Sequence, residues 1–197
     1  MIVWLASYPR SGNTLLRVIL NHVFGLKTWS LYNDTLDLGA DQATADIVGH
    51  QFLDPNFSIA AAAVDDGCWL IKTHDYPEDN RKSIYIVRDG RETLTSYLFY
   101  YKNILKQDMS LSDLISGLTP FGSWSNHLAA WNPLSREETL LLRFEDIVDD
   151  SNGCITDIAT FLNIEPISKH MPTFDELQLV NSKFFRSGKN DTWKTVF

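Results

Sequence analysis

The sequence contains few cysteines and fewer basic than acidic residues, and each of these features excludes a class of protein. Two cysteines in 197 residues cannot form the disulfide framework of a small secreted protein. Cys68 and Cys154 both stand beside apolar runs and are expected to be buried free thiols. With 17 Lys and Arg against 25 Asp and Glu, the net charge is -8, which argues against a nucleic acid polymer as partner.

Long hydrophobic runs, repeats and linkers are absent as well. The longest apolar stretch, residues 59–64, is far shorter than the roughly 20 residues that cross a bilayer. No basic segment precedes the first apolar run, as it would in a signal peptide. No group of His, Cys or Asp has the spacing of metal ligands. We therefore expect a cytoplasmic protein with no membrane partner and no metal, folded as a single domain over residues 1–197.

The pattern that is present is an alternation of short apolar runs with amphipathic segments. Apolar runs at 2–6, 68–71, 83–87 and 140–144 are expected strands, and helices are expected after residue 12 and at 91–102, 124–131 and 151–162. Residues 34–64 are expected to form short helices and loops. Continuous apolar strands between helices are typical of a parallel sheet covered on both faces. The predicted fold class is therefore α/β, a P-loop-like three-layer α/β/α arrangement with a central parallel sheet of about four to five strands.

The first loop, residues 8–14, joins an expected strand to an expected helix, and it has the features of a phosphate cradle. Gly12 permits close backbone approach, and the N–H groups at a helix start attract anions. The charge of Arg10 adds to this attraction, and the residues of the cradle are Arg10, Ser11, Gly12, Asn13 and Thr14. The loop is not a Walker A motif, because it has one Gly and no Lys after it. An ordinary turn with Ser11 as the helix N-cap is the alternative.

Two further motifs follow expected strands. Arg88 ends the strand at 83–87, and Ser96 follows two helical turns later, so that both could reach one phosphate. Taken alone, Arg88 could instead pair with Asp89 or Glu92. Lys72-Thr73-His74 follows the strand at 68–71. A lone histidine in a loop is more often structural, but Lys72 together with His74 at a strand end is more specific to catalysis.

These motifs, in this order, resemble those of the PAPS-dependent sulfotransferases of the cytosolic type, and the chain looks like a small, bacterial-like member. The first loop resembles the family's Y-P-K-S-G-T-T-W loop, with Arg10 in place of Lys and Leu15 in place of a Trp that stacks on adenine. Arg88 and Ser96 match the Arg and Ser, eight positions apart, of its 3′-phosphate site. Lys72-Thr73-His74 matches its K-T-H element.

Weaker matches extend the resemblance to nearly the whole chain. Phe121-Gly122-Ser123-Trp124 with His127 and Trp131 resembles a G-S-W-x-x-H-x-x-W segment, for which packing is the simpler role. The strand before Glu145-Asp146 resembles one that ends in Y-E-D, with Phe144 in place of a Tyr that contacts adenine. Residues 184–188 with Trp193-Lys194 resemble a late R-K-G…W-K loop, in which Ser187 replaces a Lys.

The resemblance implies an enzyme that moves a sulfuryl group from 3′-phosphoadenosine 5′-phosphosulfate (PAPS) to an acceptor hydroxyl or amine, and releases PAP. It makes His74 the general base, with Lys72 and Arg10 stabilising charge on the leaving group. The implied nucleotide-binding residues are Arg10, Ser11, Gly12, Asn13, Thr14, Leu15, Arg88, Ser96, Phe144, Phe184, Arg186, Ser187 and Gly188.

The acceptor and two rival functions stay open at this point. A small-molecule or natural-product acceptor is expected, and the aromatic candidates for its pocket are Phe52, Phe57, Tyr76, Tyr97, Tyr100 and Phe121. One rival is a P-loop kinase-like enzyme that uses Glu145 and Asp146 for Mg²⁺. The other is a PAP- or PAPS-binding protein that has lost catalysis, suggested by the substitutions at Arg10, Leu15, Phe144 and Ser187. A homodimer is one option for the assembly.

Overall fold

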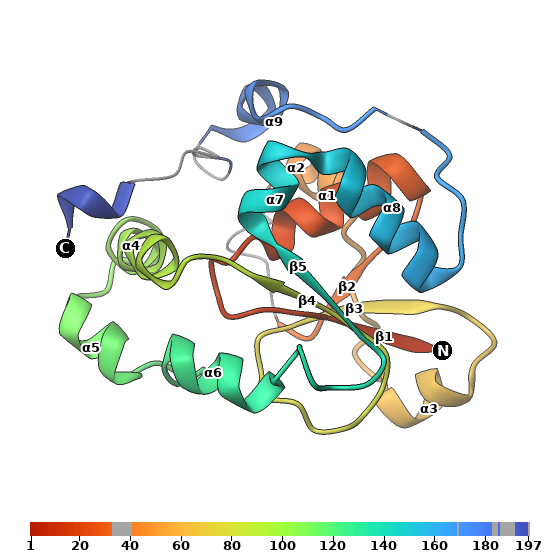
Figure 1. Cartoon of the computed structure of the whole chain (residues 1–197), viewed down its shortest axis with the longest axis horizontal. Coiled ribbons are helices and arrows are strands. Elements are labelled where there is room, and N and C mark those ends of the chain that lie inside the picture. Colours follow the sequence, from red (N-terminus) through yellow and green to blue (C-terminus); the bar gives the residue numbers. More distant parts are fainter. Residues whose placement is uncertain (33–40, 169, 183–184, 186–191, 197) are drawn as a thin grey trace.

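The computed structural model of the chain describes residues 1–32, 41–168, 170–182, 185 and 192–196 (Figure 1). Its centre is a parallel sheet with the strand order β2-β3-β1-β4-β5. The strands are β1 (Ile2–Ala6), β2 (Trp29–Ser30), β3 (Trp69–Thr73), β4 (Ser83–Val87) and β5 (Thr139–Arg143). The prediction of an α/β fold with a parallel central sheet is confirmed.

Helices cover both faces of this sheet, and the side chains of β1 alternate between them. Val3 and Leu5 pack into the larger core, beneath α1 (Asn13–Phe24), α2 (Gln42–Val48), α7 (Phe144–Asp149) and α8 (Ser151–Leu162). Ile2, Trp4 and Ala6 pack on the other face, toward α3 (Ile59–Val64) and α6 (Trp124–Trp131). The result is the three-layer arrangement seen in Figure 1, in which every residue of β1 is buried.

A smaller cluster fixes the loop that follows β1. It combines Tyr8 with residues of α4 (Gly90–Tyr100), of its π-helical continuation η2 (Tyr101–Leu105) and of α5 (Leu111–Ser116). The Tyr8 ring is fully buried, and its hydroxyl donates a hydrogen bond to the carbonyl of Gly122. The two last elements are α9 (Phe174–Asn181) and the 3₁₀ helix η3 (Thr192–Thr195), which lies beside α4 in Figure 1.

Several expectations need correction. The fourth expected strand ends one residue early, because Phe144 already begins α7, whose first turn carries the acidic residues that favour a helix start. Cys68 precedes β3 and is exposed rather than buried, whereas Cys154 on α8 is buried. The short β2 and the helices α5 and α9 were not predicted. Over the described part of residues 34–64, α2 and α3 are the expected short helices. Among the described residues, no helix combines the length and apolar character needed to span a membrane.

Candidate functional site

The loop after β1 presents the open end of α1. Arg10 and Gly12 both have left-handed backbones, with φ of 69° and 107°. A Cβ on Gly12 would lie 2.5 Å from Cδ2 of Phe144, so only glycine fits this turn. The N-cap is Gly12, not Ser11, and no side chain among the described residues makes a cap hydrogen bond at this helix start. Because the first N–H groups of a helix have no carbonyl partner within it, this end of α1 can receive an anion.

Two buried polar atoms near this loop fit such a ligand. Ser11 is 1% exposed, and its Oγ has no hydrogen-bond partner among the described residues. Nε of the buried Arg88 is also without a hydrogen-bond partner there. An unsatisfied buried polar group costs about 1–3 kcal/mol. A phosphate within hydrogen-bonding distance of these atoms would therefore satisfy them and remove this free-energy cost.

The structure brings the two predicted anion sites together at one edge of the sheet. β1 and β4 are parallel neighbours, so the loops that follow them leave the sheet at the same edge. Arg10 Nε donates to Ser96 Oγ at 3.4 Å, and the Arg10 guanidinium lies 5.0 Å from the centre of the Tyr100 ring. The Phe144 ring contacts the position of Gly12, and Arg88 lies 4.3 Å from its centre. The first loop therefore contacts both helix α4 and, through Phe144, the side chain of Arg88.

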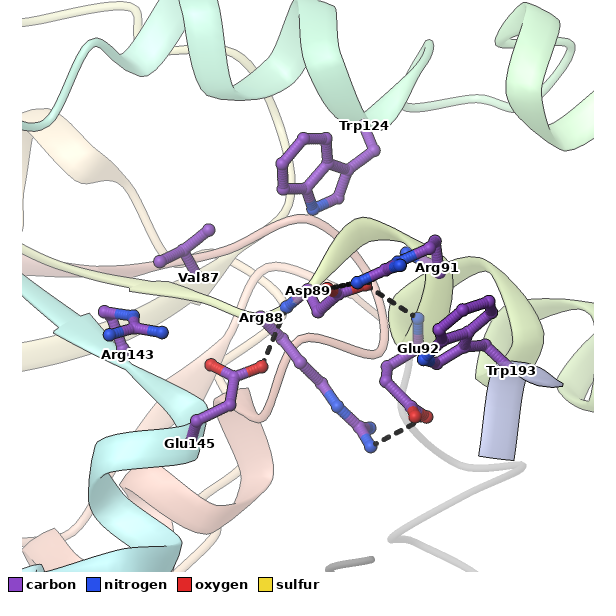
Figure 2. Close-up of a pocket in the computed structure, with 9 residues that line it drawn as sticks. All are labelled: Val87, Arg88, Asp89, Arg91, Glu92, Trp124, Arg143, Glu145 and Trp193. Carbon is purple, nitrogen blue, oxygen red and sulfur yellow. Dashed lines mark hydrogen bonds and ion pairs between the residues drawn. The ribbon is translucent and has the colours of Figure 1, made fainter. Parts of the chain in front are cut away.

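Arg88 pairs with a carboxylate beside a cavity of about 400 Å³ (Figure 2). One of its terminal nitrogens lies 3.6 Å from Oε2 of Glu92, which was the alternative partner in the sequence. Burial lowers the pKa of the Arg88 guanidinium, and the carboxylates of Glu92 and Glu145 counteract this shift. The cavity is lined by Val87, Arg88, Asp89, Arg91, Glu92, Trp124, Arg143, Glu145 and Trp193.

His74, directly after β3, is held in one tautomer. Its Nδ1 lies 2.7 Å from the carbonyl oxygen of Ser7, and because a carbonyl only accepts, Nδ1 carries the proton. Nε2 is then an unprotonated acceptor. Burial lowers the pKa of His74 well below its usual range, and the positive charges of Lys72 and Arg10 lower it further. The imidazole is therefore neutral at pH 7, as a general base must be.

His127 and Trp131 on α6 support the backbone of this element. His127 Nε2 donates to the His74 carbonyl at 3.0 Å, while the Tyr85 hydroxyl donates to His127 Nδ1 at 2.9 Å. Burial lowers the pKa of His127 to about 4, so this ring is neutral as well. Trp131 Nε1 donates to the Asp75 carbonyl at 2.9 Å. The G-S-W segment thus packs, as its pattern suggested, and also fixes the loop that carries His74.

Other predicted site residues lie in different surroundings. Leu15 belongs to the main core. The Asn13 side chain is buried, and its Nδ2 donates to the Leu5 carbonyl at 2.8 Å rather than being free for a ligand. Thr14 is half-buried at the start of α1. Lys72 Nζ lies 5.6 Å from the centre of the Tyr32 ring. The predicted nucleotide contacts Phe184, Arg186, Ser187 and Gly188 lie outside the described residues.

The six aromatic candidates for an acceptor pocket do not form one group. Phe121 lies edge-on to His74, with ring centres 5.5 Å apart, and Tyr76 packs beside His127. Tyr100 lies under Arg10. The other three lie elsewhere: Phe57 packs on Trp69, Tyr97 is buried in the α4 cluster, and Phe52 contacts His50. Within the described ranges, no group of three or more His, Cys, Asp or Glu side chains is arranged to hold a metal ion.

The chain is similar to known sulfotransferases in sequence. Sulfotransferase 2A6 of Rattus norvegicus is 31% identical over 144 residues, which cover 59% of this chain and 51% of that protein. Sulfotransferase 1B1 of Canis lupus familiaris is 26% identical over an alignment of 233 residues, covering 98% of this chain and 77% of that protein. The chain spans about half or less of the length of the first curated relatives that it matches.

The fold is similar to solved structures as well. Mouse sulfotransferase SULT7A1 complexed with PAP superposes with a TM-score of 0.72 at 19% identity, covering 99% of this chain and 77% of that one. Retinol dehydratase in complex with androsterone and PAP has a TM-score of 0.70 at 21% identity, and the match covers 100% of this chain and 76% of that one. Residues 2–197 match the family described as the sulfotransferase domain. Since this match spans nearly the entire sequence, the chain belongs to the sulfotransferase domain family.

Proposed function

We propose that the chain is an enzyme that transfers a sulfuryl group from PAPS to an acceptor hydroxyl or amine, and that residues 1–197 form one catalytic domain. The observation that best supports the proposal is the contact between Arg10 and Ser96, because it joins the loop that begins α1 to the helix that follows Arg88. Relatives in the family, such as the mouse enzyme, have been solved with PAP.

The two anion sites divide the nucleotide between them. The backbone N–H groups from Gly12 to Thr14 and the Ser11 hydroxyl, with Arg10, would hold the 5′-phosphosulfate, and Arg88 with Ser96 would hold the 3′-phosphate. The buried Ser11 Oγ and Arg88 Nε support this assignment, since each gains a partner. When bound, PAPS supplies the sulfuryl group, which passes to the acceptor as its bond to the phosphate oxygen breaks.

The residues around His74 supply the proton transfer. Nε2 takes the proton of the acceptor hydroxyl, while the Nδ1–H bond to Ser7 keeps the ring in place and stabilises the imidazolium that forms. Lys72 and Arg10 contribute positive charge on the side where the leaving phosphate gains negative charge. A small-molecule acceptor is proposed, with Phe121 beside the base and Tyr76 beside His127; the related retinol dehydratase was solved with androsterone.

The selectivity of nucleotide binding tests the donor. PAP is expected to raise the unfolding temperature far more than ADP or ATP, because only PAP carries the 3′-phosphate that Arg88 and Ser96 would bind. At 100 times its Kd, a ligand adds about 2.7 kcal/mol to the free energy of unfolding. Thermal unfolding with each nucleotide at equal concentration measures the difference. Equal shifts in unfolding temperature for all three nucleotides would contradict the assignment of Arg88 and Ser96 to the 3′-phosphate. Mg²⁺-dependent ATP turnover would favour the kinase-like rival. PAP binding without a sulfated product, over a broad acceptor panel, would favour the non-catalytic rival.

The pH dependence of transfer tests the base. A base acts in its neutral form, so activity is lost as the pH falls through the pKa of His74 in the folded enzyme. Because burial and neighbouring charge lower that pKa, kcat/KM for the acceptor should stay level through about pH 6.5, the usual histidine value, and fall only below it. A pH–rate profile from about pH 8 to about pH 5 measures this. An acidic limb at or above the usual value would contradict it.

A further inference from the structure

Tyr32 lies next to the candidate base, although no sequence pattern pointed to it. It follows β2, whose Ser30 pairs with Lys72 of β3 in parallel register. The N–H of Leu31 continues this pairing by donating to the Lys72 carbonyl at 3.4 Å. Two residues beyond Ser30 and Lys72, the same register places Tyr32 opposite His74.

The Tyr32 hydroxyl makes hydrogen bonds to three consecutive residues, of which the Thr73 hydroxyl, at 3.4 Å, is the most distant. It accepts a hydrogen bond from the His74 backbone N–H at 2.6 Å, and lies 2.9 Å from Oδ2 of Asp75. Because a backbone N–H only donates, the single proton of the hydroxyl points to the Asp75 carboxylate. Burial raises the pKa of Tyr32, so the hydroxyl keeps this proton at neutral pH. Asp75, Tyr32 and His74 therefore form one oriented chain of hydrogen bonds.

The Tyr32 ring contacts both candidate catalytic side chains. It lies nearly parallel to the His74 imidazole, with centres 5.5 Å apart and an interplanar angle of 15°. Phe121 stands edge-on to the Tyr32 ring at 5.7 Å and so limits its rotation. Lys72 Nζ lies 5.6 Å from the centre of the same ring, within the range of a cation–π contact.

We infer that Tyr32 is a positioning residue of the reaction, which holds the imidazole plane and the Lys72 ammonium in the geometry for transfer, with Asp75 fixing its hydroxyl. The inference rests on the proposed function. Tyr32 acts through His74 and Lys72 rather than on the substrates. Its loss therefore lowers kcat and leaves nucleotide binding intact, because it contacts neither the end of α1 nor Arg88.

Two variants separate the hydroxyl from the ring. Tyr32→Phe keeps the stack and removes the hydrogen bonds, and kcat should fall about tenfold, the scale of one such bond. Tyr32→Leu also removes the stack, and kcat should fall about a hundredfold. In both variants the Kd for PAP should stay within about twofold of the wild-type value. Asp75→Ala should add little to Tyr32→Phe, because both changes break the same chain of bonds.

The protonation of His74, followed by NMR without nucleotide, gives a readout that does not depend on turnover. The groups that face the imidazole are Lys72 and Asp75 on its own segment, Tyr32, Arg10 in the first loop and His127 on α6. Tyr32→Phe should leave the pKa of His74 unchanged, because the ring still covers it. Tyr32→Leu exposes the imidazole to water, which reduces its burial, and the pKa of His74 should therefore rise toward about 6.5.

The control is Tyr101→Phe, which removes the same hydroxyl from the cluster beneath α4, away from His74, and should leave kcat unchanged. If the wild-type enzyme transfers sulfuryl groups and Tyr32→Phe keeps the full kcat, the role of Tyr32 is overturned while the proposed function stands. An equal loss of PAP affinity and kcat would also overturn this role, since it would indicate general loosening. If the wild-type protein transfers no sulfuryl group, the proposed function fails. Separately, an unchanged pKa of His74 in Tyr32→Leu would show that the Tyr32 ring does not shield the imidazole, and would overturn the inference about Tyr32.

Discussion

Replacing His74 with alanine is expected to lower kcat by about 10²–10⁴-fold, the usual contribution of a general base, while the Kd for PAP stays within about twofold. The loss follows from the tautomer. The Ser7 carbonyl holds the proton on Nδ1, so Nε2 is the one acceptor that the ring offers to the acceptor hydroxyl. Binding persists because the 5′- and 3′-phosphates of PAP would contact the end of α1 and Arg88, and not the imidazole.

Three measurements make this result specific. Product formation with radiolabelled PAPS gives kcat, and calorimetry with PAP gives Kd. Thermal unfolding shows whether the loss of the Ser7 bond destabilises the fold. His22→Ala, on the outer part of α1 and bonded to the Ile47 carbonyl, is a matched control that should keep full activity. Added imidazole should restore part of the His74→Ala turnover. Full turnover in His74→Ala would remove His74 from the role of base.

Much of the fold could be predicted because parallel strands buried on both faces appear as continuous apolar runs. Ser83–Val87 was predicted with its observed limits, since the charged residue Arg88 ends the apolar run in the sequence. β2 escaped prediction because two residues carry no periodicity, and its pairing with β3 depends on contacts distant in sequence. The same shortness hid Tyr32, which gains its place only through that register.

The candidate site shows where reasoning from sequence stops. The motifs placed the loop, Arg88 and His74 at the ends of strands, and in the structure they follow β1, β4 and β3. Their roles in the reaction stay predictions. The motifs could not give side-chain direction: Asn13 has the polarity of a ligand contact, yet its side chain is buried and bonds to the Leu5 carbonyl. The boundary at Phe144 was also hidden, because its apolar character suits the end of a strand as well as the first turn of α7.

Replacing Arg88 with alanine is expected to weaken PAP binding about 10–100-fold, and to weaken AMP, which lacks the 3′-phosphate, less than about threefold. Hydrogen bonds to charged groups contribute about 1.5–3 kcal/mol, which sets this scale. The difference between the two nucleotides isolates the 3′-phosphate, because both share the adenosine and the 5′-phosphate. Calorimetric titration of each nucleotide into each variant measures it.

The ion pair with Glu92 must be separated from this effect. Arg88→Ala breaks an ion pair with a carboxylate that is 2% exposed, and removing one partner of a buried pair destabilises a protein by about 3–5 kcal/mol. The double variant Arg88→Ala/Glu92→Gln also removes the buried negative charge, so it should recover stability but not PAP affinity. Arg81→Ala, at the opposite end of β4 and paired with Asp79, is the matched control and should bind both nucleotides normally. Equal losses for PAP and AMP in the double variant would mean that Arg88 does not read the 3′-phosphate, and that its role is to hold Glu92 and Phe144 in place.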